Sequence, residues 1–133
     1  MQYMLDTDIC VYIARQSNPK VMARFGKHSL GDLGISVVGY GELRVGTEKS
    51  NHRAEALKAL DTFIQVVPVL PMDPEVGAIY GRIRSELESK GQIIGANDLW
   101  IASHCLQLGL TLVTNNAREF SRIPNLTIEN WTQ

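Results

Sequence analysis

The sequence predicts an α/β fold in which helices flank a short, mainly parallel sheet. Its 133 residues, of which 44% are hydrophobic and 20% charged, have the length and composition of one globular domain over residues 1–133. Short apolar runs alternate along the chain with longer segments of helical spacing, a pattern typical of parallel sheets. Acidic residues follow several of the apolar runs, where ligands bind in folds of this kind.

The first strand and the first two helices are expected near the N-terminus. Residues 2–5 form an apolar run that ends at Asp6 and predicts a strand. The apolar spacing that follows predicts a helix over 7–15. Pro19 suits the first turn of a second helix, because a missing N–H costs nothing there, and Gly26 lies near the end of that helix.

A second strand and helix bring another acid to the same kind of position. The glycines at 31 and 34 indicate a loop, and the apolar run 35–37 predicts a short strand after it. The helix that follows places Glu42 in its first or second turn. Asn51 is then expected to cap the next helix, because its short polar side chain accepts from backbone N–H groups.

The middle of the chain predicts an edge strand and the most regular helix. Residues 66–70 are apolar but contain Pro68, which cannot donate to a ladder, so this strand is placed at a sheet edge. Asp73 and the proline after it form a cap and a first helical turn. Apolar residues then recur at helical spacing until Gly91.

The last third predicts a largely buried helix between two strands. Residues 95–104 open this helix, with Asn97 as its expected cap and Asp98 in its first turn. Gly109 is expected to end it. Two further strands are expected at 110–113 and 127–128.

Charge and cysteine content limit the classes of function. With 13 basic and 14 acidic side chains the net charge is −1, which argues against a protein that coats nucleic acid non-specifically. No apolar run approaches the roughly 20 residues of a membrane helix and no signal peptide is evident, so a cytoplasmic protein without a membrane partner is expected. Cys10 and Cys105 are expected to be buried thiols, and the three scattered histidines give little support for zinc.

Four polar residues occupy comparable positions at the ends of the predicted strands. Asp6 ends the first strand, Glu42 and Asp98 begin helices, and Asn116 follows the strand at 110–113. Parallel neighbouring strands would bring all four to one edge of the sheet. Carboxylates gathered in this way raise each other's pKa unless a cation is present. Oxygen ligands without histidine or cysteine favour Mg²⁺ or Mn²⁺, and hence chemistry on phosphate esters.

Each of these residues also has a purely structural explanation. Asp and Glu are common in the first turn of a helix because they interact favourably with the helix dipole. Asp8 is expected to be a cap or a supporting group rather than a direct ligand. Thr7 and Thr114 either orient carboxylates through their hydroxyls or act as ordinary caps. Arg118 either contacts an RNA phosphate or pairs with Glu119 at the surface.

Three segments resemble the VapC-type toxins of the PIN-domain ribonucleases. They are MLDTDICVYI at the start, SVVGYGELRVG, and GANDLWIASHCLQLGLTLVTNNAREFSRIPNLTIENW at the end, and the resemblance covers essentially the whole chain. It implies a PIN-like three-layer sandwich with a metal-binding quartet at the carboxyl edge of the sheet. By motif, Asp6, Glu42 and Asp98 would be the first three members. Asn116 would be the fourth, and its neutral amide favours one protein-held ion, with another recruited by the RNA phosphate.

The resemblance also implies a function and partners. Proteins of this family are Mg²⁺- or Mn²⁺-dependent endoribonucleases, the toxins of type II toxin–antitoxin systems, which cut structured RNA such as tRNA loops and stop translation. A VapB-type antitoxin would neutralise the toxin. A homodimer, and a higher assembly with the antitoxin, are expected.

Other classes of function fit the sequence less well. Asp6, Thr7 and Asp8 also form the DxD of haloacid-dehalogenase phosphatases, but no suitable lysine or later acidic pair follows. A receiver-type signalling domain fits poorly as well, because the last predicted sheet strand lacks the lysine that such domains carry. The remaining alternative is a non-catalytic RNA-binding or interaction module with a degenerate PIN site.

Overall fold

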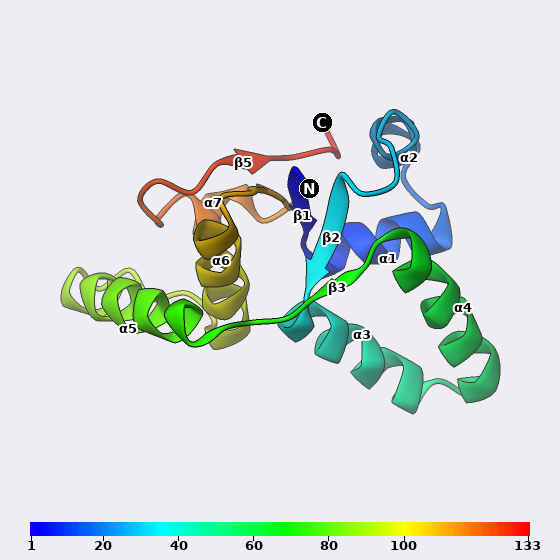
Figure 1. Cartoon of the computed structure of the whole chain (residues 1–133), viewed down its shortest axis with the longest axis horizontal. Coiled ribbons are helices and arrows are strands. Elements are labelled where there is room, and N and C mark those ends of the chain that lie inside the picture. Colours follow the sequence, from blue (N-terminus) through cyan, green and yellow to red (C-terminus); the bar gives the residue numbers. More distant parts are fainter.

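The computed structural model describes all of residues 1–133 and contains one sheet with helices on both faces (Figure 1). The five strands lie in the order β3-β2-β1-β4-β5, and all neighbours are parallel, which confirms the predicted α/β class. The strands are β1 (Tyr3–Leu5), β2 (Leu33–Ser36), β3 (Val69–Leu70), β4 (Thr111–Val113) and β5 (Ile128–Glu129). The helices are α1 (Thr7–Arg15), α2 (Pro19–Phe25), α3 (Val37–Lys49), α4 (Arg53–Val66), α5 (Pro74–Ser89), α6 (Ala96–Leu108) and α7 (Ala117–Phe120). No helix combines the length and apolar character needed to cross a bilayer.

Strand β1 lies at the centre of the sheet and fixes the position of the site. Tyr3 pairs with Leu33 of β2 on one side and with Thr111 of β4 on the other. Because these strands are parallel, their carboxyl ends meet at one edge. The residues that follow β1, β2 and β4 in the sequence are therefore neighbours in space.

The two faces of the sheet carry separate hydrophobic cores, because successive strand residues point to opposite faces. Met4 and Leu112 belong to a core of 11 buried residues that is completed mainly by α5 and α6. Leu5 and Val113 belong to a second core of 10 buried residues, shared with α1 and α2. Figure 1 shows α5 and α6 on one side of the strands and α1 to α4 on the other. Both cysteines are free and buried, as predicted.

Strand β2 lies earlier in the sequence than the predicted 35–37. Val37 is the first residue of α3, because Ser36 Oγ accepts a hydrogen bond from Val38 N (3.1 Å) and caps that helix. Gly34 lies within β2 rather than in a loop. A Cβ at Gly34 would come within 2.6 Å of Met1 Sδ and 2.9 Å of Leu70 Cδ1. Glycine is used here for close packing and not for a turn.

Strand β3 is shorter than predicted but lies at the sheet edge as expected. Val66 is still part of α4, and only Val69 and Leu70 pair with β2. Pro68 precedes the strand, and its carbonyl accepts a hydrogen bond from Ile35 N (2.9 Å). A proline is tolerated at this position because no N–H is required from it.

The predicted ends of the helices agree with the structure in part. Asp73 caps α5 and Gly109 ends α6 in the left-handed conformation (φ 68°), both as predicted. The cap predicted at Asn51 is wrong, because α4 begins at Arg53 and its N-terminus has no side-chain cap. The cap predicted at Asn97 is also wrong, because this residue already lies inside α6.

Candidate active site at the carboxyl edge of the sheet

Asp6 is the most buried acid of the chain and lies directly after β1. Its side chain caps α1 by accepting from Thr7 N (2.8 Å), and it also accepts from Thr114 Oγ1 (2.7 Å), beyond the end of β4. Only 6% of Asp6 is exposed. Burial, followed by the charge of Asp8, raises its pKa to about 7, although the bonds from Thr114 and Thr7 act in the opposite direction.

Glu42 reaches the same edge from the second turn of α3. Thr7 Oγ1 donates to Glu42 Oε1 at 2.6 Å, which joins the first turn of α1 to α3. Leu43 and Thr47 lie beside these residues in a groove of about 370 Å³ between α1, α3 and α4. Glu42 therefore lies where this groove meets the sheet edge.

Asp8 is engaged by backbone groups on both sides. Its Oδ1 accepts from Ile9 N (2.8 Å), and its Oδ2 accepts from Asn115 N (3.2 Å) in the segment after β4. Burial raises the pKa of Asp8, and the charge of Glu42 acts in the same direction. The position of Asp8 suits a group that links α1 to the end of β4.

Asp98 lies in the first turn of α6 and is half-buried. Its pKa is raised by burial first, then by the charges of Glu42, Glu119 and Asp8. Asp98 also contributes to the raised pKa of Asp6. The charge of Glu42 therefore acts on Asp98 and the charge of Asp98 acts on Asp6, although the three acids come from different parts of the chain.

Asn116 lies at the predicted edge but contacts a residue that sequence reasoning did not select. Its backbone N–H donates to Thr114 Oγ1 (2.9 Å), and its Nδ2 donates to Glu119 Oε2 (2.9 Å). Glu119 is on the short helix α7, which was not predicted. The available signal was its position three residues after Asn116, because residues three apart on a helix are neighbours.

No basic side chain neutralises the acids at this edge. The ion pairs of the protein lie elsewhere, for example between Arg24 and Glu129 (2.6 Å) and between Arg84 and Glu88 (2.9 Å). Arg118 is exposed and forms no ion pair with Glu119, one of its two expected roles. The negative charge of the edge is therefore uncompensated by the chain itself.

The donor set at this edge fits a hard divalent cation. All candidate ligands are carboxylate or amide oxygens, which favour Mg²⁺ or Mn²⁺ over zinc. The pKa values of Asp6 and Asp98 are raised by burial first and then by neighbouring acids, and a bound cation would favour their charged forms. No group of three or more His, Cys, Asp or Glu side chains is already arranged to hold an ion. The carboxylates of Asp6 and Glu42 instead accept hydrogen bonds from Thr114 and Thr7.

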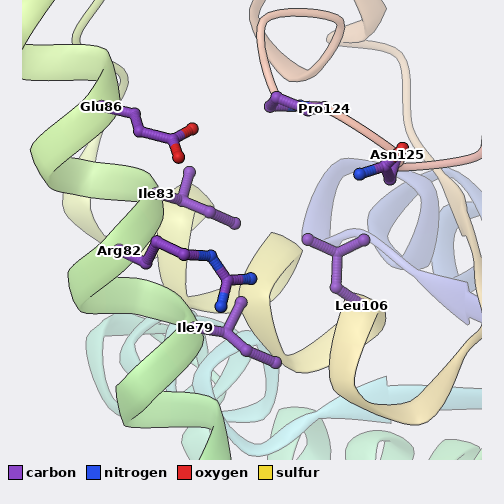
Figure 2. Close-up of a pocket in the computed structure, with 7 residues that line it drawn as sticks. All are labelled: Ile79, Arg82, Ile83, Glu86, Leu106, Pro124 and Asn125. Atoms are coloured by element: carbon purple, nitrogen blue, oxygen red, sulfur yellow. The ribbon is translucent and has the colours of Figure 1, made fainter.

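A second pocket, of about 300 Å³, lies on the opposite helical layer and contains none of these acids. Figure 2 shows Arg82 and Glu86 of α5 on one side of this pocket and Leu106 of α6, Pro124 and Asn125 on the other. Its lining mixes apolar and charged side chains without a cluster of candidate ligands. The sheet edge therefore remains the candidate active site.

Comparison with known proteins agrees with the fold. The PIN domain family matches residues 3–126. The chain therefore belongs to the PIN-domain family.

The similar proteins include VapC ribonucleases, which match the chain over nearly their whole length. The chain is 41% identical to Ribonuclease VapC2 of Rickettsia felis, with 98% of each chain covered. It is 36% identical to the tRNA(fMet)-specific endonuclease VapC of Shigella flexneri, with 99% of each covered. The crystal structure of VapBC2 from Rickettsia felis bound to a promoter DNA fragment contains a chain with a TM-score of 0.90 and 40% identity, covering 98% of this chain and 99% of that one. The resemblance to VapC-type PIN domains is confirmed.

Proposed function

We propose that this protein is a VapC-type toxin, a Mg²⁺- or Mn²⁺-dependent endoribonuclease that acts in the cytoplasm as one domain over residues 1–133. The observation that carries the proposal is the uncompensated negative charge at the carboxyl edge of the sheet, where Asp6 is buried without a basic partner. Its substrate is structured RNA, most simply tRNA, as the name of the Shigella relative suggests.

Asp6, Glu42 and Asp98 are the residues that would hold the ion. When bound, the ion supplies an activated water and neutralises charge on the scissile phosphate. Thr114 and Thr7 orient the carboxylates of Asp6 and Glu42 through their hydroxyl hydrogen bonds. Asp8 is a supporting residue, since its carboxylate holds the backbone at Asn115.

Arg118 is proposed to contact RNA. It is exposed on α7, two positions after Asn116, and its guanidinium has no ion pair within the chain. A free guanidinium beside a phosphodiester site suits a contact to a backbone phosphate, which positions RNA without reading its sequence.

The proposed partners are a VapB-type antitoxin and a second copy of the chain. Similar solved structures include VapBC assemblies, and two of these are bound to DNA, in one case a promoter fragment. A basic residue of the antitoxin placed at the acidic edge would supply the charge that the toxin lacks. A homodimer of the toxin, joined to the antitoxin in a higher assembly, completes the proposal.

Cleavage of tRNA by the purified protein tests this function. We expect wild-type protein to cut tRNA with Mg²⁺ or Mn²⁺ and to lose activity in excess chelator. Asp6→Asn and Asp98→Asn should each lower the rate by at least about a hundredfold, because each removes a charge from the ion site. Asp61→Asn, an exposed acid on α4, is the matched control and should leave the rate unchanged.

The outcome also separates the two functional classes. Wild-type protein that binds tRNA but leaves it intact with either ion would overturn the nuclease and favour a non-catalytic RNA-binding module. Equal cleavage rates for wild type, Asp6→Asn and Asp98→Asn would place the chemistry elsewhere. Circular dichroism spectra of the variants should match that of the wild type, so that lost activity is not lost folding.

A further inference from the structure

A short segment after β5, residues 130–132, reaches the same edge of the sheet as the acids. Strand β5 is parallel to β4, and Thr114 N donates to Glu129 O (3.0 Å), so the chain that leaves β5 continues beside the chain that leaves β4. The polar side chains of this segment therefore lie beside the turn 114–116, which carries Thr114 and Asn116 of the candidate site.

The side chain of Asn115, in the middle of that turn, is held on two sides. Its Oδ1 accepts from Asn130 Nδ2 (3.3 Å) and from Thr132 Oγ1 (3.0 Å). The Thr132 hydroxyl also reaches Asn130 Oδ1 (2.7 Å), so the three side chains form one cluster. On the other side, Asn115 Nδ2 donates to Tyr12 OH (3.4 Å) in the second turn of α1. Asn115 is exposed, so its amide is ordered by these neighbours rather than by burial.

The segment itself is fixed independently of Asn115, through Trp131. The indole is fully buried, lies nearly parallel to the ring of His28 (centroids 5.2 Å apart), and donates from Nε1 to Glu129 Oε1 (3.0 Å). Glu129 in turn pairs with Arg24 of α2 (2.6 Å). Because this anchor lies in the core, the segment is the fixed partner, and the exposed turn is the part that it holds.

The turn that Asn115 occupies determines where the Thr114 hydroxyl points. Thr114 Oγ1 accepts from Asn116 N (2.9 Å) and donates to Asp6 Oδ2 (2.7 Å). The backbone N–H of Asn115 donates to Asp8 Oδ2 (3.2 Å), which ties the same turn to α1. A displacement of the turn therefore changes the hydrogen bond that orients the Asp6 carboxylate.

We propose that Asn130 and Thr132 are positioning residues of the active site, which act through Asn115 to keep the Thr114 hydroxyl on Asp6. The inference rests on the proposed nuclease function and adds to it two residues that form no hydrogen bond with the acids of the site. A positioning role predicts a lower kcat at an unchanged KM, because RNA still binds while the carboxylate is less well oriented. A role limited to stabilising β5 predicts lower stability at an unchanged kcat.

Steady-state cleavage of tRNA by point variants tests the proposal. Thr132→Val removes the hydroxyl at nearly constant side-chain volume and should lower kcat by about threefold to tenfold, the change expected from one lost hydrogen bond, at the same KM. Thr132→Ser keeps the hydroxyl and should restore most of the rate. Thr127→Val is the matched control, because the exposed Thr127 precedes β5 and forms no hydrogen bond with Asn115, and it should cleave as the wild type does.

Two kinetic results would contradict the positioning role. One is an equal kcat for Thr132→Val and Thr127→Val. The other is a rise in KM at an unchanged kcat, which would make the segment a contact to RNA instead.

A double-mutant cycle tests whether Thr132 acts through Asn115. Asn115→Ala removes the amide to which Thr132 donates, so we expect it to lower kcat by itself and to abolish any further effect of Thr132→Val. The same cycle with Asn130→Ala tests the second donor, with the same expected result. Effects that multiply in either double variant would show independent contributions and overturn the route through Asn115.

Amide hydrogen exchange measured by NMR follows the turn itself, without RNA or metal. We expect Thr132→Val to speed exchange at Asn115 and Asn116, whose N–H groups donate to Asp8 and Thr114, while amides in the middle of α5 exchange at the wild-type rate. Unchanged exchange in the turn would overturn the proposal. Equal acceleration in the turn and in α5 would do the same, because it would show a general loss of stability.

The kinetic and exchange measurements separate failure of this inference from failure of the proposed function. Wild-type protein that cuts no tRNA with either ion contradicts the nuclease itself. Wild-type protein that cuts tRNA, alongside a Thr132→Val variant with wild-type kcat and wild-type exchange in the turn, contradicts only the positioning role.

Discussion

At the scale of single residues, the site is defined by a buried acid without a counter-charge. Asp6 is held by hydrogen bonds from Thr7 and from Thr114, 108 residues away in the sequence, yet burial and its acidic neighbours outweigh them. An isolated buried carboxylate costs free energy in its charged form. The buried carboxyl group of Asp6 is therefore stabilised either by binding a proton or by a neighbouring cation.

The raised pKa of Asp6 predicts how the stability of the folded protein depends on pH. The pKa of Asp6 is raised from 3.8 to about 7 on folding, so between those values the folded protein holds a proton that the unfolded chain has released. The contribution of protonated Asp6 to the free energy of unfolding is fully present below about pH 4 and is lost as the pH rises to about 7. In urea unfolding, metal-free wild type should lose more stability than Asp6→Asn between about pH 5.5 and pH 8. Equal losses in the two proteins would contradict the assignment.

At the scale of elements, the distance between Asp98 and Glu42 depends on how α6 and α3 are packed against each other. His104 of α6 is fully buried, with Nδ1 2.9 Å from Ser36 Oγ and Nε2 3.1 Å from Pro71 O. A carbonyl only accepts, so Nε2 carries the proton and Ser36 donates to Nδ1. Ser36 caps α3, the helix of Glu42, while Asp98 lies in the first turn of α6. The histidine therefore joins the two helices that bring these acids to the edge.

Substitution of His104 should show how much its two hydrogen bonds contribute to the free energy of unfolding. His104→Leu leaves the O–H of the buried Ser36 without its acceptor, at a cost of roughly 1–3 kcal/mol, whereas the carbonyl of the exposed Pro71 bonds to water instead. His104→Asn keeps an acceptor for Ser36 and should lose less. Chemical denaturation measures both against His52→Leu, an exposed control that should change stability by less than about 0.5 kcal/mol. Identical midpoints for His104→Leu and His52→Leu would contradict the link.

The elements differ in how far the sequence predicts them. Long periodic segments such as α5 were predicted closely, because apolar spacing over several turns leaves few alternatives. The four-residue α7 was missed, because one turn has no periodicity, and Glu119 was missed with it. The cap predicted at Asn97 failed because a good capping residue can also lie inside a helix. Contacts such as Thr114 with Asp6 depend on strand order, which no local pattern contains.

At the scale of the whole molecule, the parallel sheet explains why distant residues form one site. Asp6 follows β1 and Asn116 follows β4, while Glu42 and Asp98 come from α3 and α6. The order β3-β2-β1-β4-β5 places β1 between the strands that lead into α3 and α7. Two separate cores fix the helices on both faces. The edge can therefore hold mutually repelling acids together, because the packing of the whole domain opposes their separation.

Anomalous diffraction from crystals soaked in Mn²⁺ tests this account most directly, because it locates the ion relative to each acid. The account predicts a manganese peak within coordination distance of the Asp6 and Asp98 carboxylates, with Glu42 beside them. The ion should be absent from matched crystals of Asp98→Asn. Manganese found only elsewhere on the molecule, or no peak at a concentration that saturates binding in solution, would contradict a metal site at the carboxyl edge of the sheet.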